Sequence, residues 1–109
     1  MVEIERQIAD ELRRRLPDWV RKHLRQMILF GSRARGDAPE DSDLDLVALV
    51  DDKTPELEQA IDDVAYSVMW DHDFRPTISL KVFAEERFNT AVARGYSFYR
   101  NVIREGIVL

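Results

Sequence analysis

The sequence contains no cysteine and only four glycines and four prolines among its 109 residues. The absence of cysteine excludes disulfides, thiol catalysis and cysteine-ligated zinc, and it suits the reducing cytoplasm. No apolar run approaches the ~18 residues of a membrane-spanning helix. The first five residues include two acids and lack the apolar segment of a signal peptide. We therefore expect a cytoplasmic protein that does not enter a membrane.

Basic residues are fewer than acidic residues in this chain. The chain has 16 lysines and arginines against 21 aspartates and glutamates, which gives a formal net charge of -5. This balance argues against general binding of nucleic-acid backbones, which requires clustered positive charge. The acidic residues gather in the segment 37–45. A chain of this length has room for one compact domain, over residues 1–109, and leaves none for a separate acceptor-binding domain.

Apolar residues recur at helical spacing in three parts of the chain. The first part is an amphipathic helix that ends at Pro17. Its apolar stripe consists of Ile4, Ile8, Leu12 and Leu16. The second helix begins at Thr54, a residue type that caps helices, and runs for about four turns. The third part extends from residue 84, with a break at Gly95 and an end at Gly106.

Strands are predicted between these helices. Residues 27–30 and 44–50 are almost continuously apolar, which is typical of strands covered on both faces. Residues 77–83 alternate between polar and apolar, which indicates a strand exposed on one side. Together the elements predict an α/β (α+β) fold in which helices cover a small mixed sheet. The closing segment 106–109 either packs into this core or forms a homodimer interface.

The dipeptide Gly31-Ser32 lies where the first strand ends and a short helical turn begins. Backbone N–H groups at such a turn attract anions, and glycine lets a phosphate approach the main chain closely. The Ser32 hydroxyl would bond the same phosphate, and Arg33 or Arg35 would add positive charge from the side. The alternative is an ordinary tight turn at the surface.

Asp43 and Asp45 open the second strand, and their side chains leave the same face of it. Two carboxylates in these positions repel each other unless a cation binds between them. Oxygen ligands of this kind suit Mg²⁺ or Mn²⁺, which would also bind the phosphates of a nucleotide. The alternative is a solvated acidic end of a strand.

Ten residues, 33–42, separate Ser32 from Asp43. The combined pattern resembles the GS-x10-D-x-D signature of the DNA polymerase β-like nucleotidyltransferase superfamily, and the short chain resembles its minimal, MNT-type branch. The resemblance implies a nucleotidyltransferase fold, ATP or another nucleoside triphosphate as substrate, and Asp43 and Asp45 as catalytic metal ligands. It also implies a reaction in which an acceptor hydroxyl attacks the α-phosphorus and releases pyrophosphate.

The sequence departs from that family pattern at one position. Most active members carry a third carboxylate on the strand after the long helix, and the matching residue here is Ser79. A hydroxyl is a poor metal ligand and no useful base near neutral pH. Lys81 shares the face of Ser79 and would contact phosphate or partly replace a metal, while Asp71 and Asp73 precede the strand as substitute acids.

Two main hypotheses of function follow. In the first, the chain moves AMP from ATP to a hydroxyl of a partner protein. This follows from its resemblance to minimal family members, which often act as antitoxins of HEPN-type ribonuclease toxins. In the second, the chain still binds nucleotide but has lost efficient catalysis, and it regulates its partner by contact through the acidic segment 37–45. A third hypothesis is transfer to a small, aminoglycoside-like acceptor.

Overall fold

A four-stranded mixed sheet in the order β3-β2-β1-β4 forms the centre of the computed structural model, which describes residues 2–39 and 41–109. The strands are β1 (Leu24–Phe30), β2 (Leu44–Val50), β3 (Ile78–Ala84) and β4 (Ile107–Val108). β1 runs antiparallel to β2 and β4, whereas β2 and β3 are parallel. The central β1–β2 pairing therefore brings the end of β1 beside the start of β2. Glu40, in the acidic segment 37–45, lies outside the described residues.

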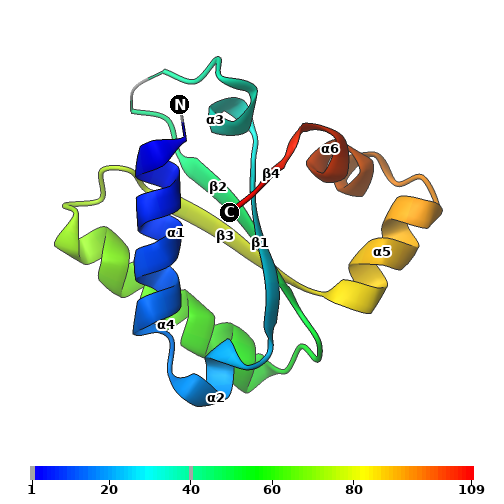
Figure 1. Cartoon of the computed structure of the whole chain (residues 1–109), viewed down its shortest axis with the longest axis horizontal. Coiled ribbons are helices and arrows are strands. Elements are labelled where there is room, and N and C mark those ends of the chain that lie inside the picture. Colours follow the sequence, from blue (N-terminus) through cyan, green and yellow to red (C-terminus); the bar gives the residue numbers. More distant parts are fainter. Residues whose placement is uncertain (1, 40) are drawn as a thin grey trace.

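Helices cover both faces of the sheet, as the sequence predicts (Figure 1). One face packs against α1 (Glu3–Arg15), α2 (Asp18–Arg21) and α4 (Pro55–Asp71). The other face packs against α5 (Glu85–Ala93) and α6 (Ser97–Glu105), and the short helix α3 (Ser32–Arg35) follows β1. Within residues 2–39 and 41–109, none of the helices combines the length and apolar character needed to cross a membrane.

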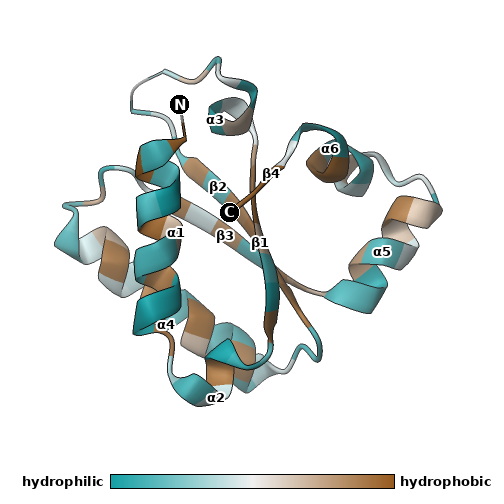
Figure 2. Ribbon diagram, in the orientation of Figure 1, coloured by the Kyte–Doolittle hydropathy of each residue, from teal (hydrophilic) through white to brown (hydrophobic). Residues whose placement is uncertain are grey.

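The strand β2 is buried on both faces, which explains its continuous apolar run (Figure 2). Leu44 and Leu46 pack in the core beneath α1 and α4. Val47 and Leu49 pack against α5 and α6. Because successive side chains of a strand point to opposite faces, Asp45 lies on the same side as Val47, facing the α5–α6 layer.

The predicted cap of the second long helix is confirmed. The Thr54 hydroxyl accepts a hydrogen bond of 3.1 Å from the amide of Leu57, and Pro55 occupies the first turn. The predicted break at Gly95 and end at Gly106 are also confirmed, since α5 ends at Ala93 and α6 at Glu105. Local signals in the sequence therefore set the bounds of these helices.

The predicted stripe of α1 is wrong at its first position. Ile4 is 59% exposed, whereas Glu5 is only 6% exposed and lies on the face of Ile8 and Leu12. A helix turns about 100° per residue, so a spacing of four drifts by about 40° at each step. A stripe aligned on Ile8 and Leu12 therefore continues through residue 5, and it places a carboxylate on the apolar face.

The closing segment packs into the core of this chain. Its strand β4 pairs with β1, with Val108 opposite Ile28, and the amide of Leu109 donates to the carbonyl of Met27 at 2.8 Å. Ile107 and Leu109 are partly buried against the core beneath α1. Internal packing of the segment is thus observed for Ile107 and Leu109, while Val108 is 56% exposed and the homodimer interface stays a prediction.

Candidate functional site

The first strand ends in a turn whose backbone favours glycine. Gly31 has φ 75° and ψ -158°, and it stands at the N-cap of α3. The amides of Ala34 and Arg35 both donate to the Gly31 carbonyl at 3.1 Å. The amide of Ser32 lies at the start of the turn, before the residues that donate these hydrogen bonds. A main-chain donor in this position is suited to an incoming anion.

Asp45 lies directly against this turn. In the antiparallel register Asp45 is the partner of Phe30, the residue before Gly31. A Cβ atom on residue 31 would lie 2.5 Å from Oδ2 of Asp45 and 3.4 Å from its Cγ. The glycine turn and the carboxylate of β2 therefore meet at one point, as the spacing of the motif predicts.

Charged groups from three elements converge around Asp45. Its side chain is half-buried, and this burial raises the pKa of its carboxyl group above the ordinary value. The neighbouring charge of Asp43 raises the pKa of Asp45 further, while the charges of Lys81 and Arg35 act in the opposite direction. The site thus combines the carboxylate of Asp45 in β2 and that of Asp43, just before β2, with cations from β3 and α3.

The structure places Ser79 beside Asp45. In the parallel pairing of β2 with β3, Asp45 is the register partner of Ser79, and Val47 is the partner of Lys81. Both β3 residues are thus on the face of Asp45, with Ser79 half-buried and Lys81 exposed. Asp71, one of the predicted substitute acids, instead forms an ion pair of 2.7 Å with Arg15.

The two arginines of the motif have different surroundings. Arg35 forms ion pairs with Asp37 and Glu105, each at 3.4 Å, and its charge reaches Asp45. Arg33 donates to Glu5 at 3.0 Å and to the Ser42 carbonyl at 2.8 Å. The side chains of Arg33 and Glu5 are only 13% and 7% exposed, so this pair ties α1 to the loop before Asp43.

Glu5 and Glu105 are the residues of this region that the sequence analysis missed. Glu5 carries a detectable signal, because it is a carboxylate on the apolar face of α1 and a buried charge needs a partner. Glu105 carries no such signal, since it meets Arg35 across 70 positions of sequence.

A hollow of about 240 Å³ adjoins the turn on its α6 side. Its lining consists of Phe30, Gly31, Arg35, Phe98, Asn101, Val102 and Glu105. The glycine turn is therefore open to a ligand on the side of the sheet that carries Asp45.

The carboxylates fit a divalent cation that is shared with a substrate. Among residues 2–39 and 41–109, no three histidine, aspartate or glutamate side chains gather closely enough to hold a metal ion by themselves. Asp43 and Asp45 supply hard oxygen ligands, and Mg²⁺ in proteins is commonly bound by one or two carboxylates together with phosphate oxygens and water. A cation here would also offset the repulsion between the two carboxylates.

Comparisons with known proteins identify the family of the chain. The family model of the nucleotidyltransferase domain matches residues 5–104. The "Putative protein adenylyltransferase MJ0604" of Methanocaldococcus jannaschii is 36% identical over 89 residues, which cover 82% of this chain and 81% of that protein. A solved structure described as "Crystal structure of the toxin-antitoxin with AMP-PNP" has a TM-score of 0.59 and 23% identity, over 95% of this chain and 70% of that chain. The chain therefore belongs to the nucleotidyltransferase domain family.

Proposed function

We propose that this nucleotidyltransferase transfers AMP from ATP to a hydroxyl group of a partner protein, with Mg²⁺ or Mn²⁺ held by Asp43 and Asp45. The observation that carries the proposal is the contact between the Gly31 position and the Asp45 carboxylate, because it joins an anion-binding turn to the paired acids. The relative from M. jannaschii, named as a protein adenylyltransferase, supports AMP as the group transferred and a protein as its acceptor.

We assign the chain the role of an antitoxin that acts in the cytoplasm on a HEPN-type ribonuclease toxin. The structural neighbour, a toxin-antitoxin with AMP-PNP, supports both a nucleotide and a protein partner. The acidic residues Asp37, Asp41 and Asp43 are exposed beside the site and suit a basic partner surface.

In this proposal the residues of the chain bind and orient the triphosphate. Ser32 donates to phosphate oxygens from its amide and its hydroxyl, and Arg35 contributes positive charge. The cation held by Asp43 and Asp45 would supply charge neutralisation at the phosphate oxygens. The acceptor oxygen forms a bond to the α-phosphorus while the bond to pyrophosphate breaks, and the hydroxyl proton passes to solvent.

Arg33 is left out of this set of ligands. Its side chain is only 13% exposed and is engaged by Glu5 and by the Ser42 carbonyl, whereas the side chain of Arg35, although paired, is 44% exposed. We assign it the task of holding the loop that leads to Asp43.

A second candidate function is nucleotide binding without efficient transfer. It is favoured by Ser79, the register partner of Asp45. This residue carries a hydroxyl where most active members of the resembled DNA polymerase β-like superfamily carry a carboxylate. In this case the chain would regulate its partner by contact alone.

The deciding experiment mixes the protein with Mg-ATP labelled at the α-phosphate and with the protein encoded by the adjacent gene. We expect label on that partner, and we expect Asp43→Asn to abolish it. Asp52→Asn, which changes an exposed aspartate just beyond the other end of β2, is the matched control and should leave labelling intact. Calorimetric binding of Mg-ATP without labelling would favour the contact-only function, and absence of binding would sink both.

A further inference from the structure

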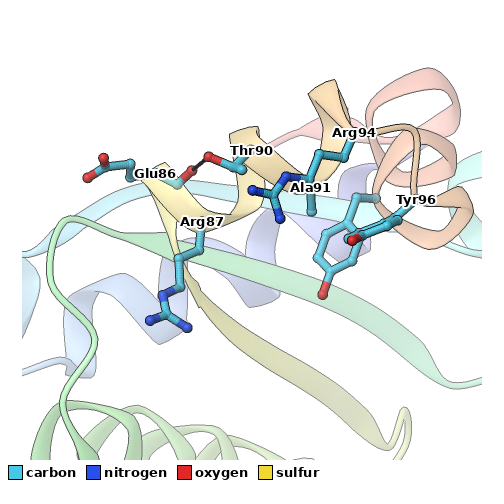
Figure 3. Close-up of a pocket in the computed structure, with 7 residues that line it drawn as sticks. Glu86, Arg87, Thr90, Ala91, Arg94 and Tyr96 are labelled. Atoms are coloured by element: carbon cyan, nitrogen blue, oxygen red, sulfur yellow. Dashed lines mark hydrogen bonds between the residues drawn. The ribbon is translucent and has the colours of Figure 1, made fainter.

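A second hollow lies on the helices α5 and α6, apart from the site described above (Figure 3). Its volume is about 550 Å³, and it is a shallow hollow, wide open to solvent. Its lining consists of Glu86, Arg87, Thr90, Ala91, Arg94, Tyr96 and Tyr99, which we call the α5–α6 groove. The groove shares no residue with the Gly31–Asp45 site, so it calls for an explanation of its own.

Two guanidinium groups of the groove carry uncompensated charge. Arg87 lies in α5 and Arg94 caps the C-terminal end of that helix, about two turns further on, or about 10 Å along the helix axis. Throughout the described part of the chain, neither has an acidic side chain within ion-pair distance; Arg15, Arg21 and Arg35 are paired, and the exposed Arg14 and Arg100 are not. Figure 3 shows Glu86 directed away from Arg87, and the guanidinium of Arg94 beside Ala91. The lining of the groove thus carries two arginines against one glutamate, in a protein whose net charge is negative.

Aromatic rings form the other wall of the groove. Tyr99 is fixed by ring contacts with Phe83 at 5.5 Å and Phe88 at 5.3 Å. Tyr96 is 54% exposed, and its centroid lies 6.4 Å from that of Tyr99. Packing in the core therefore accounts for Tyr99, but it leaves much of the Tyr96 ring open to the groove.

We propose that the α5–α6 groove is a second nucleotide site, which binds a nucleoside monophosphate without a metal ion. The forked donors of Arg87 and Arg94 match phosphate oxygens, and guanidinium is the side-chain group best suited to that geometry. The exposed ring of Tyr96 offers a stacking surface for the base. Protein cations supply the positive charge here, so the site needs neither Asp43 nor Asp45. A long nucleic acid is disfavoured because the chain carries a net charge of -5.

The experiment is a titration of isotope-labelled protein with AMP in EDTA, followed by NMR at the side-chain Nε–H groups of arginine. We expect saturable shifts at Arg87 and Arg94, and about tenfold weaker binding in both Arg87→Gln and Arg94→Gln, because each loses a charge-assisted hydrogen bond. Arg104→Gln is the matched control, since this α6 arginine is 70% exposed and lies outside the groove. Asp43→Asn should leave AMP binding in EDTA unchanged, which separates the groove from the transferase site.

Three results would overturn the proposal. Shifts that persist in both arginine variants would place the nucleotide elsewhere. Equal affinity for inorganic phosphate and AMP would show that the groove does not recognise the base. Tighter binding of a hexaglutamate peptide than of AMP would reassign the groove to an acidic protein segment. Circular dichroism of each variant tests whether the fold is retained. A variant that keeps its fold and loses binding assigns the loss to the groove.

Discussion

A Cβ atom on residue 31 would lie 2.5 Å from Oδ2 of Asp45, closer than van der Waals contact allows. Gly31 also has φ 75° and ψ -158°, a backbone conformation that is essentially restricted to glycine and costs other residues about 1–3 kcal/mol. Glycine therefore serves two purposes at this position, since it permits the turn and leaves space for the carboxylate.

Gly31→Ala tests this relationship. We expect it to displace Asp45 and to lower the affinity for Mg-ATP by about tenfold or more, which corresponds to about 1.4 kcal/mol. Gly95→Ala is the control, because Gly95 has a similar φ of 82° and a Cβ atom there would lie no closer than 3.5 Å to the flexible Arg100 side chain. Calorimetry measures binding and urea denaturation measures stability. Equal losses of binding in the two variants would refute the local role of Gly31.

The raised pKa of Asp45 predicts a pH-dependent effect on stability. A carboxyl group whose pKa is raised in the folded state stabilises the fold at low pH, and this stability is lost as the pH rises through the folded-state pKa. Asp45→Asn removes the charge that burial and Asp43 disfavour. In EDTA at pH 7 we expect its Tm to exceed that of the wild type by about 2–4 °C, or about half a kcal/mol.

The advantage of Asp45→Asn should vanish below the ordinary aspartate pKa of 3.8, because the wild-type carboxyl is then protonated in both states. Mg-ATP should reverse the order at pH 7, since a ligand that binds only the folded wild type raises its Tm. An Asp45→Asn variant that melts below the wild type in EDTA at pH 7 would contradict the raised pKa of Asp45 in the folded state.

The Glu5–Arg33 pair should contribute more to stability than the surface pairs. Arg33→Met leaves the Glu5 carboxylate in a buried position without this partner, and removal of one member of a buried pair costs about 3 kcal/mol. The double variant Glu5→Met, Arg33→Met should recover much of that loss. Urea denaturation of the four proteins gives the coupling energy.

The exposed pair Asp18–Arg21 is the control for this cycle. Its side chains are 98% and 43% exposed, so its coupling should stay within about 0.5 kcal/mol. Similar coupling in the two pairs would show that the Glu5–Arg33 pair gains nothing from its burial.

Ser79→Asp tests whether the absent third carboxylate limits transfer. Because residue 79 is the register partner of Asp45, the new carboxylate would face the same space, and we expect partner labelling to be preserved or raised. In EDTA the variant should be less stable than the wild type, since it adds a third negative charge. Thr77→Asp adds the same charge just before β3 and should not raise labelling. Loss of labelling in Ser79→Asp alone would show that the hydroxyl itself is required.

Elements defined by local signals could be predicted from the sequence. The helix capped by Thr54 and the strand 44–50 follow from residues that are near one another in the chain. The meeting of Gly31 with Asp45 was predicted from the motif and its family resemblance. The strand β1 begins three residues earlier than the apolar run predicts, because the exposed Arg25 and Gln26 belong to it.

Other features depend on contacts that periodicity does not encode. The strand β4 has only two residues, too few to show any alternation, and it forms because β1 offers it a free edge. The Glu5–Arg33 pair joins residues 28 positions apart. The sequence suggested Arg33 and Arg35 equally as phosphate ligands, and only the tertiary arrangement distinguishes their surroundings.

The glycine turn and Asp45 belong to a single hairpin, formed by β1, α3 and β2, and Asp43 lies just before β2. The cost in chain entropy of closing the connection, residues 31–43, grows only slowly with its length, so local pairing of β1 with β2 can bring Gly31 to Asp45, while Glu5 of α1 holds the loop through Arg33. Ser79 and Lys81 reach the same face from β3, more than thirty positions further along the chain. A change in how β3 pairs with β2 would therefore alter the surroundings of Asp45 without touching the glycine turn.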